Sequence, residues 1–228
     1  MDAETLRRIP FFRALDATAL AFLSQRARLR RCTPGQAIVQ QDVPADAVYL
    51  IDRGRASVSV TGRDGRAMTL RELGPGEIIG EVSLLDGGAP SATVTALVKT
   101  ELVAIDRASF TNLLAQRPQI AVALLPVLAS RLRLLTTWVD DLAGLPLPAR
   151  LAKCLLRIAA DHGQNVGPAR RRISQKISQE DLARRLGVTR ESVNKHLRRL
   201  EKTNVIVKEA GYLVVTNLAA LQASADAG

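Results

Sequence analysis

The chain is poor in the residues that build several common kinds of functional site. Its 228 residues include two cysteines, two histidines and only 3% aromatic residues. The cysteines, Cys32 and Cys154, are far apart and form no CxxC pair, which argues against a disulfide framework, a zinc site or an iron–sulfur cluster. With 47% hydrophobic residues, the cores must therefore be built from Leu, Val, Ile and Ala.

Long apolar runs are also missing. No uncharged apolar stretch reaches the roughly 18 residues that indicate a membrane span, so we expect no membrane association. The first residues, MDAETLRRIPFF, do not resemble a signal peptide, which has a basic start and then a long apolar core. No nucleophile–base pair, metal cluster or paired-carboxylate motif stands out. These absences predict a cytoplasmic protein that is not an enzyme.

What the chain has instead is an uneven excess of positive charge. Its formal net charge is +10. Residues 1–149 contain 17 Lys and Arg and 15 Asp and Glu, whereas residues 150–228 contain 15 Lys and Arg and only 7 Asp and Glu. A small basic module joined to a nearly neutral one indicates contact with a polyanion. A solvated basic face is the alternative if no motif lies within it.

The first half of the chain has the pattern of an all-β domain. After short helices expected over residues 1–25, short apolar runs continue to about residue 106, separated by turn signals. Asp64-Gly65 is a strong hairpin signal. Short strands at this regular spacing predict an antiparallel sandwich or barrel.

A long helix is predicted over residues 120–142. Its apolar residues recur at spacings of three and four, at Val122, Leu125, Leu128, Leu132, Leu135 and Val139. Pro118 interrupts the pattern before it, and Pro126 inside it predicts a kink or a later helix start. The stripe either covers its own domain or forms a dimer seam across a two-fold axis. The stripe alone does not decide between these.

Residues 144–148, GLPLP, are the best candidate for a hinge, because two prolines and a glycine end a helix. A second domain then begins. A helix is expected over residues 149–161 and a loop over 163–172, which ends in three arginines.

Residues 177–202, ISQEDLARRLGVTRESVNKHLRRLEK, predict a helix-turn-helix. Ser178 is a good N-cap, supported by Asp181 three residues later. Gly187 suits the end of the first helix, and Thr189 caps the second. The following segment, VIVKEAGYLVVTN, reads as a hairpin that turns near Glu209–Gly211, the wing of a winged helix. A basic helix pair in some other domain is the alternative, but cap, turn and apolar spacing agree with the motif.

The outward face of the second helix carries the candidate DNA contacts. Arginine can donate two hydrogen bonds to guanine, and a carboxylate can accept one from cytosine. Hydroxyls, amides and backbone N–H groups at helix starts suit phosphates. The predicted DNA-binding residues are Ser178, Gln179, Thr189, Arg190, Glu191, Asn194, Lys195 and Arg198. Because one helix-turn-helix reads few base pairs, we expect a homodimer on a palindromic site, which favours the dimer seam.

The segments GEIIGEVSLLDGG, SATVTA and SQEDLARRLGVTRESVNKHLRRLE resemble the Crp/Fnr (cyclic-AMP receptor protein) family over almost the whole chain. The resemblance implies an α+β fold with a β-roll sensor domain (1–118), a dimerisation helix and hinge (119–144) and a winged helix-turn-helix DNA-binding domain (145–228). It places Arg190, Glu191 and Lys195 at the base-contacting positions. It also implies double-stranded DNA, a second copy of the chain and RNA polymerase as partners.

The same resemblance implies an effector pocket, and some residues of this sequence differ from the family's pocket residues. The implied effector-binding residues are Gly80, Glu81, Ser91, Ala92 and Thr136. Pro90 stands where the family has its phosphate-binding arginine, and Leu135 with Thr136 replaces a Thr-Ser pair that contacts adenine. Losing that cation removes a charge-assisted contact, so Ser91 and helix N-terminal amides would hold an anion more weakly. This argues against cyclic AMP as the effector.

Several alternatives for the sensor stay open. The effector is another small molecule, such as a different nucleotide, or the regulator is constitutive with a degenerate pocket. Glu81 binds the ligand or is a structural carboxylate. An iron–sulfur cluster is not expected with one cysteine in the sensor, nor haem, because His162 and His196 both lie in the DNA-binding part. Cys32 is a thiol sensor or a small buried hydrophobe. A regulatory subunit that acts on a partner protein is a further alternative, against which the basic motif argues.

Overall fold

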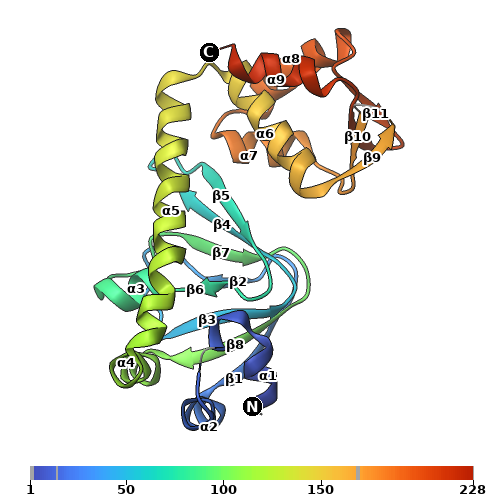
Figure 1. The fold of residues 1–228 in the computed structure, drawn as a ribbon. Helices are drawn as coiled ribbons and strands as arrows, with labels where there is room; N and C mark the ends of the chain where they lie inside the picture. Colours follow the sequence, from blue (N-terminus) through green and yellow to red (C-terminus); the bar gives the residue numbers. More distant parts are fainter. Residues whose placement is uncertain (1–2, 14, 168–169, 228) are drawn as a thin grey trace. The chain divides into compact units, whose positions relative to one another are not determined.

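The apolar runs of the first half form antiparallel strands, as their spacing predicts. This computed structural model describes residues 3–13, 15–167 and 170–227, in two compact units, residues 1–132 and 133–228 (Figure 1). The strands of the first unit are β1 (Arg28–Cys32), β2 (Ala37–Val39), β3 (Ala47–Arg53), β4 (Ala56–Thr61), β5 (Ala67–Leu73), β6 (Ile78–Ile79), β7 (Thr93–Ala96) and β8 (Thr100–Asp106). Two four-stranded sheets have the orders β1-β8-β3-β6 and β2-β7-β4-β5.

The core between these sheets is built from aliphatic side chains of alternate strand positions. Ile51, Ile79 and Leu102 are buried in it, and Cys32 is only 1% exposed. That burial favours Cys32 as a small hydrophobe. The Asp64-Gly65 hairpin joins β4 to β5 as predicted, with Gly65 at φ +76°, which a residue with a side chain adopts at a cost.

Helices cover the rest of the first unit. They are α1 (Ala3–Arg8), the 3₁₀ turn η1 (Pro10–Phe12), α2 (Ala17–Arg26), α3 (Glu81–Asp86), α4 (Arg107–Gln116) and the long helix α5 (Pro118–Gly144). Asp16 and Asp106 cap α2 and α4 by accepting backbone N–H groups at 2.7 and 2.8 Å. Leu20, Phe110 and Leu124 share one core with the first helices, which fastens the start of α5 to the sheets.

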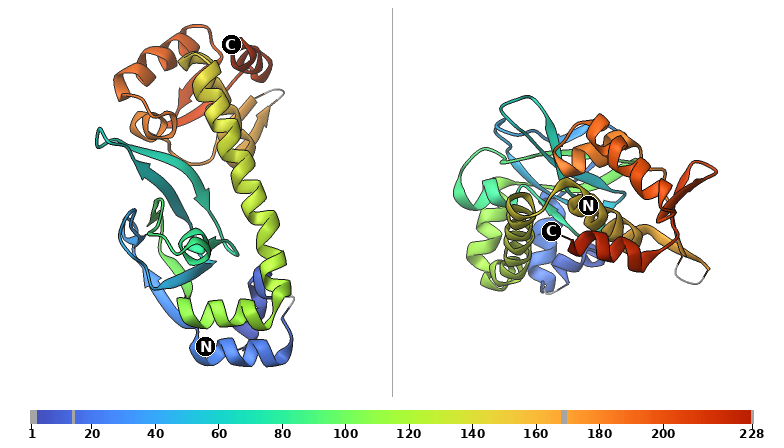
Figure 2. Two further views of the ribbon diagram at one scale, coloured as in Figure 1. Left: turned by 90° about the vertical axis from the view of Figure 1, so that its left-hand side faces the viewer. Right: turned by 90° about the horizontal axis from the view of Figure 1, so that it is seen from above.

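The long helix begins earlier than the prolines suggested. Pro118 does not interrupt it but opens it, because a first-turn residue needs no N–H partner. The predicted late start at Pro126 is wrong, since that residue lies inside α5. Figure 2 shows the long helix as one unbroken ribbon.

Two faces of α5 carry apolar residues. One face packs inside its own chain and includes Ile120, Leu124 and Val127. The other is exposed to solvent, with Leu125, Leu132 and Val139 61%, 66% and 65% exposed. Because both faces carry apolar residues, α5 is apolar enough as well as long enough to cross a membrane, judged by length and composition alone.

The second unit packs helices against a small sheet around its own core. Its elements are α6 (Leu147–His162), β9 (Gly163–Gly167), β10 (Arg170–Ile173), α7 (Gln179–Leu186), α8 (Arg190–Lys202), β11 (Ile206–Glu209), β12 (Tyr212–Val215) and α9 (Leu218–Asp226). The sheet has the order β11-β12-β10-β9. Leu155, Leu182, Val193 and Val214 are among the fully buried residues of this unit. The expected α+β fold with a winged helix-turn-helix is confirmed.

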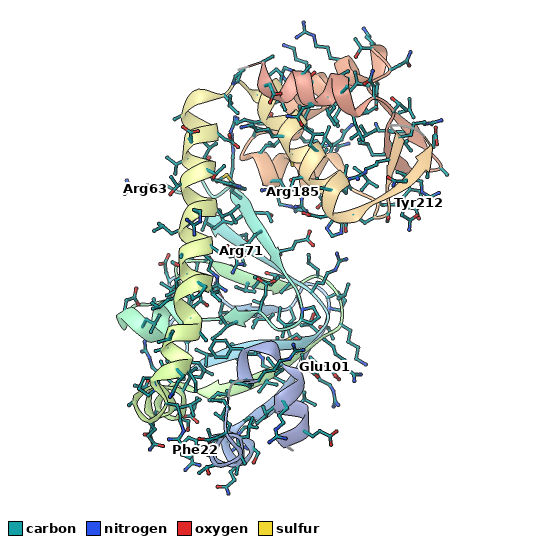
Figure 3. The ribbon with its side chains drawn as sticks, viewed as in Figure 1. Phe22, Arg63, Arg71, Glu101, Arg185 and Tyr212 are labelled. Carbon is teal, nitrogen blue, oxygen red and sulfur yellow. The ribbon has the colours of Figure 1, made fainter. Side chains whose placement is uncertain are left out.

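The loop expected over residues 163–172 is wrong: apart from residues 168 and 169, which lie outside the described residues, this segment forms β9 and β10. Two of its arginines have partners in the sheet and on α6. Arg172 lies over the ring of Tyr212, which is labelled in Figure 3, at 4.6 Å. Arg171 donates to the Ala159 carbonyl oxygen of α6 at 3.2 Å. The strand is therefore stabilised by groups distant in sequence, which local propensity does not reveal.

Candidate functional site

The first helix of the helix-turn-helix begins at a complete capping box. The Ser178 hydroxyl accepts the Asp181 backbone N–H at 3.0 Å, and the Asp181 carboxylate accepts the Ser178 backbone N–H at 3.0 Å. Burial opposes ionisation of Asp181, but hydrogen bonds from Ser178 and Arg184 outweigh it and lower the pKa of Asp181. Both residues thus fix the start of α7.

The turn between α7 and α8 has the geometry that its glycine predicts. Gly187 ends α7 at φ 65° and ψ 35°, the left-handed conformation. The Thr189 hydroxyl accepts the Ser192 N–H at 3.2 Å and so starts α8. Leu186, Val193 and Leu197 face the core, which turns the polar side of α8 outward.

That polar side forms a continuous basic surface. Glu191, Lys195 and Arg198 are exposed on it. The residues that line this open groove are Glu191, Ser192, Asn194, Lys195, Arg198, Arg199 and Lys202. Four cations face one carboxylate here, so the surface suits a polyanion, while Glu191 remains able to accept from a base.

A side-chain network joins the two helices at the start of this surface. The Gln179 amide donates to the Asn194 side chain at 3.0 Å, and Arg190 Nε donates to the Gln179 side-chain oxygen at 3.4 Å. Gln179, Asn194 and Arg190, three of the predicted DNA-binding residues, are therefore together. The network holds Asn194 and Gln179 in place and leaves the outer nitrogens of Arg190 outside these hydrogen bonds.

His196 lies on α8 but is not part of the exposed basic surface. Burial lowers the pKa of His196, and repulsion from Lys195 and Arg199 adds to the effect. The ring therefore stays neutral at neutral pH. The positive charge of α8 comes from its arginines and lysines.

The predicted effector residues gather around a pocket in the first unit. Gly80, Glu81, Ser91 and Ala92 all line a cavity of about 80 Å³ between the second sheet, α3 and α5. Gly80 takes φ +88°, and a Cβ there would lie 3.2 Å from the Ala47 carbonyl oxygen, so the turn into α3 needs glycine.

Thr136, the fifth predicted effector residue, is exposed on α5 and is not among the described residues that line this pocket.

Two arginines in this pocket escaped the sequence prediction. Arg131, on the inward face of α5, forms an ion pair with Glu81 and donates to the Ile78 carbonyl oxygen at 2.7 Å. Glu81 is only 3% exposed, so its carboxylate is a buried ion-pair partner and makes no side-chain cap for α3. Arg131 continues the spacing of three and four residues set by the inward residues Leu124 and Val127. This spacing could have predicted from the sequence that Arg131 faces inward.

Arg71 on β5 is the second arginine, and it pairs with Glu77 at 3.0 Å (Figure 3). Burial lowers the pKa of Arg131 to about 10, and repulsion from Arg71 adds to the shift. Both guanidinium groups therefore remain charged at neutral pH. An anion that entered the pocket would compete with Glu81 and Glu77 for them.

Pro90 lines the same pocket and supplies no donor there. It is buried, and its carbonyl oxygen accepts the Asp42 backbone N–H at 2.9 Å. Beside it Ser91 is exposed. The side of the pocket at residues 90–92 thus offers one hydroxyl and no cation.

Comparison with known proteins gives matches over both units. A family model for the cyclic nucleotide-binding domain matches residues 29–117, and one for the Crp-like helix-turn-helix domain matches residues 149–224. The CRP-like cAMP-activated global transcriptional regulator of Mycobacterium tuberculosis is 31% identical over 91% of this chain and 96% of its own. The cyclic AMP receptor protein of Thermus thermophilus is 34% identical over 85% of this chain and 86% of its own.

Solved structures show the same fold. A Crp/Fnr-family regulator from Eubacterium rectale superposes with a TM-score of 0.79 at 17% identity, over 96% of this chain and 98% of its own. The c-di-GMP responsive global regulator of Xanthomonas campestris superposes with a TM-score of 0.77 at 22% identity, over 88% of this chain and 99% of its own. At these identities the likeness concerns the fold alone.

Proposed function

The chain belongs to the Crp/Fnr family of transcriptional regulators, and from this membership we propose that it binds palindromic double-stranded DNA as a homodimer. We propose a sensor over residues 1–118, a dimerisation helix and hinge over 119–144 and a DNA-binding domain over 145–228. RNA polymerase as a partner and the cytoplasm as its location follow from the resemblance as parts of the same proposal.

The observation that carries DNA binding is the basic surface of α8. Its cations project from one side of a helix whose opposite side is buried, and Thr189 and Gly187 fix the direction in which the helix starts. We assign base contacts to Arg190, Glu191 and Lys195. We assign phosphate contacts to Ser178, Gln179, Thr189 and Arg198, and to Asn194 mainly the bracing of Gln179.

The exposed apolar face of α5 supports the proposal that the chain forms a homodimer. Leu125, Leu128, Leu132, Leu135, Val139 and Leu142 follow a seven-residue repeat, and all except the half-buried Leu128 are exposed. A monomer would leave this stripe in water at a cost of roughly 1.5–3 kcal/mol per large side chain, and pairing two copies removes the cost. This two-sided packing also accounts for the apolar composition of α5 without a membrane.

Selection of bound duplexes from a random DNA library tests this function. We expect a two-fold symmetric site whose half-sites are about 34 Å, one helical turn, apart. The midpoint of binding should weaken steeply as salt rises, because phosphate contacts release counterions. Enrichment of no sequence, with the protein folded and dimeric, would contradict sequence-specific binding.

For the sensor, we propose that cyclic AMP binds weakly or not at all. Two observations support this proposal. Pro90 provides no cation at its side of the pocket, and the carboxylates of Glu77 and Glu81 already pair with the two arginines. Another small molecule, such as a different nucleotide, would have to exchange these pairs. A constitutive regulator with a degenerate pocket is the alternative, and the small volume of about 80 Å³ favours it.

Introducing a cation at position 90 tests the proposal that cyclic AMP binds weakly because Pro90 provides none. A charge-assisted hydrogen bond contributes about 1.5–3 kcal/mol, so Pro90→Arg should tighten cyclic AMP binding by roughly 10- to 100-fold in calorimetric titration. Pro90→Gln is the matched control, because it removes the ring without adding charge. Tight binding by the unmodified chain, unchanged in Pro90→Arg, would refute this account of the pocket.

A further inference from the structure

A second cavity, unrelated to the β-roll pocket, lies within the second unit. It has a volume of about 280 Å³, is open to solvent on one side, and is lined by the last turns of α5, by α6 and by the end of α7. This is close to the lower end of the 300–1,000 Å³ or so that small-molecule sites occupy. No residue of the α8 groove lines it, and of the α5 stripe only Leu142 does.

One side of this cavity is apolar. Trp138 and Leu134 line it from α5, Cys154 from α6 and Leu186 from α7. Burial raises the pKa of the Cys154 thiol, so the thiol stays protonated and acts as an apolar wall. An indole beside aliphatic groups suits a flat, apolar body.

The remaining walls are strongly basic. The cations among the described lining residues are Arg150, Lys153 and Arg157 from α6 and Arg185 from α7, which is labelled in Figure 3. The one carboxylate among them is that of Asp141. Asp141 is already paired with Lys153 at 2.6 Å. Arg150 Nε is buried and has no hydrogen-bond partner within the described part of the chain. Four cations beside an apolar space, with one carboxylate already paired among them, suit an anion.

We propose that this cavity binds a small organic anion with an aromatic or apolar body. The anionic group would lie between Arg150, Arg157 and Arg185, and the body would lie against Trp138. Such a ligand would contact α5 and the end of α7 at once. Because α7 precedes the recognition helix, occupancy would bear directly on the position of the helix-turn-helix. This site is separate from the β-roll pocket, and its test requires neither DNA nor a β-roll effector.

The chain offers its own reporter for this site, because Trp138 is its single tryptophan. The full-length protein is titrated with 8-anilinonaphthalene-1-sulfonate, an aromatic anion, while energy transfer from Trp138 to the dye is followed. We expect saturable transfer, and a dissociation constant about tenfold higher in Arg157→Gln and in Arg185→Gln, the loss of one charge-assisted contact each.

Two controls separate a site from general dye binding. Arg184→Gln removes the same charge one position away on α7, outside the cavity lining, and should leave the dissociation constant unchanged. The neutral analogue N-phenyl-1-naphthylamine should bind at least tenfold more weakly. Equal binding of both dyes, or unchanged affinity in folded Arg157→Gln and Arg185→Gln, would overturn the proposal.

Competition then identifies the source of the anionic group. Displacement of the dye by adenosine monophosphate assigns the site to phosphate-bearing ligands, and displacement by benzoate assigns it to aromatic carboxylates. If neither displaces the dye at millimolar concentration, the cavity binds the dye alone and selects neither kind of anion, and the proposal fails.

Discussion

Leu132→Glu is expected to convert the proposed dimer into monomers and to weaken binding to a full palindromic site by a factor of about 10³. Leu132 is 66% exposed at the middle of the α5 stripe. In the proposed dimer it meets its own copy across the two-fold axis, so the substitution removes two apolar contacts and brings two carboxylates together without a counter-ion. Two unpaired carboxylates at the centre of an apolar seam must lose their hydration when the copies meet, which opposes pairing.

The measurement combines sedimentation velocity with binding to full-site and half-site duplexes. Because position 132 is exposed within one chain, each unit should keep its fold, while the unfolding temperature falls only by the stabilisation that dimerisation supplied. Leu29→Glu is the control, since Leu29 is a 45% exposed leucine on β1, away from α5. A Leu132→Glu protein that still sediments as a dimer would place the seam elsewhere.

The helix-turn-helix was predictable from sequence because every signal for it is local. The capping box at Ser178, the left-handed Gly187 and the cap at Thr189 lie within twelve consecutive residues. Each acts through bonds to residues three or four positions away. The structure adds the bracing of Gln179 by Asn194, which depends on how the two helices cross and has no local signature.

The β-roll pocket could be predicted only in part. Gly80 and Glu81 stand in a recognisable motif, but Arg71 and Arg131 come from β5 and α5, sixty residues apart. Arg71 meets Glu77 only six residues further along the chain, but whether Arg131 meets Glu81 depends on the packing of α5, which no local pattern specifies. Strand β10 shows the same limitation, since one of its two partners, β12, follows about forty residues later, although the other, β9, directly precedes it. Local signals identify caps and turns, whereas long-range pairs need the fold.

Arg190→Ala is expected to reduce binding at the selected palindrome by about 1–3 kcal/mol per half-site, roughly 5- to 150-fold each. Arg190 is exposed in the first turn of α8, where a recognition helix meets base edges. Gln179 holds its Nε at 3.4 Å, which leaves the two terminal nitrogens free of that bond and able to donate in parallel to one guanine. The same change should relax sequence preference at one base pair of each half-site.

Fluorescence anisotropy on the selected palindrome, on single-base variants and on random duplex separates a base contact from a phosphate contact. Lys202→Ala is the matched control, because Lys202 lies at the far end of the same helix and its loss should weaken all duplexes alike. A base contact predicts a loss for Arg190→Ala that is large on the palindrome and small on random DNA, since non-specific affinity comes from phosphates. An equal loss on both would move Arg190 to the phosphate contacts and leave Glu191 and Lys195 to read the bases.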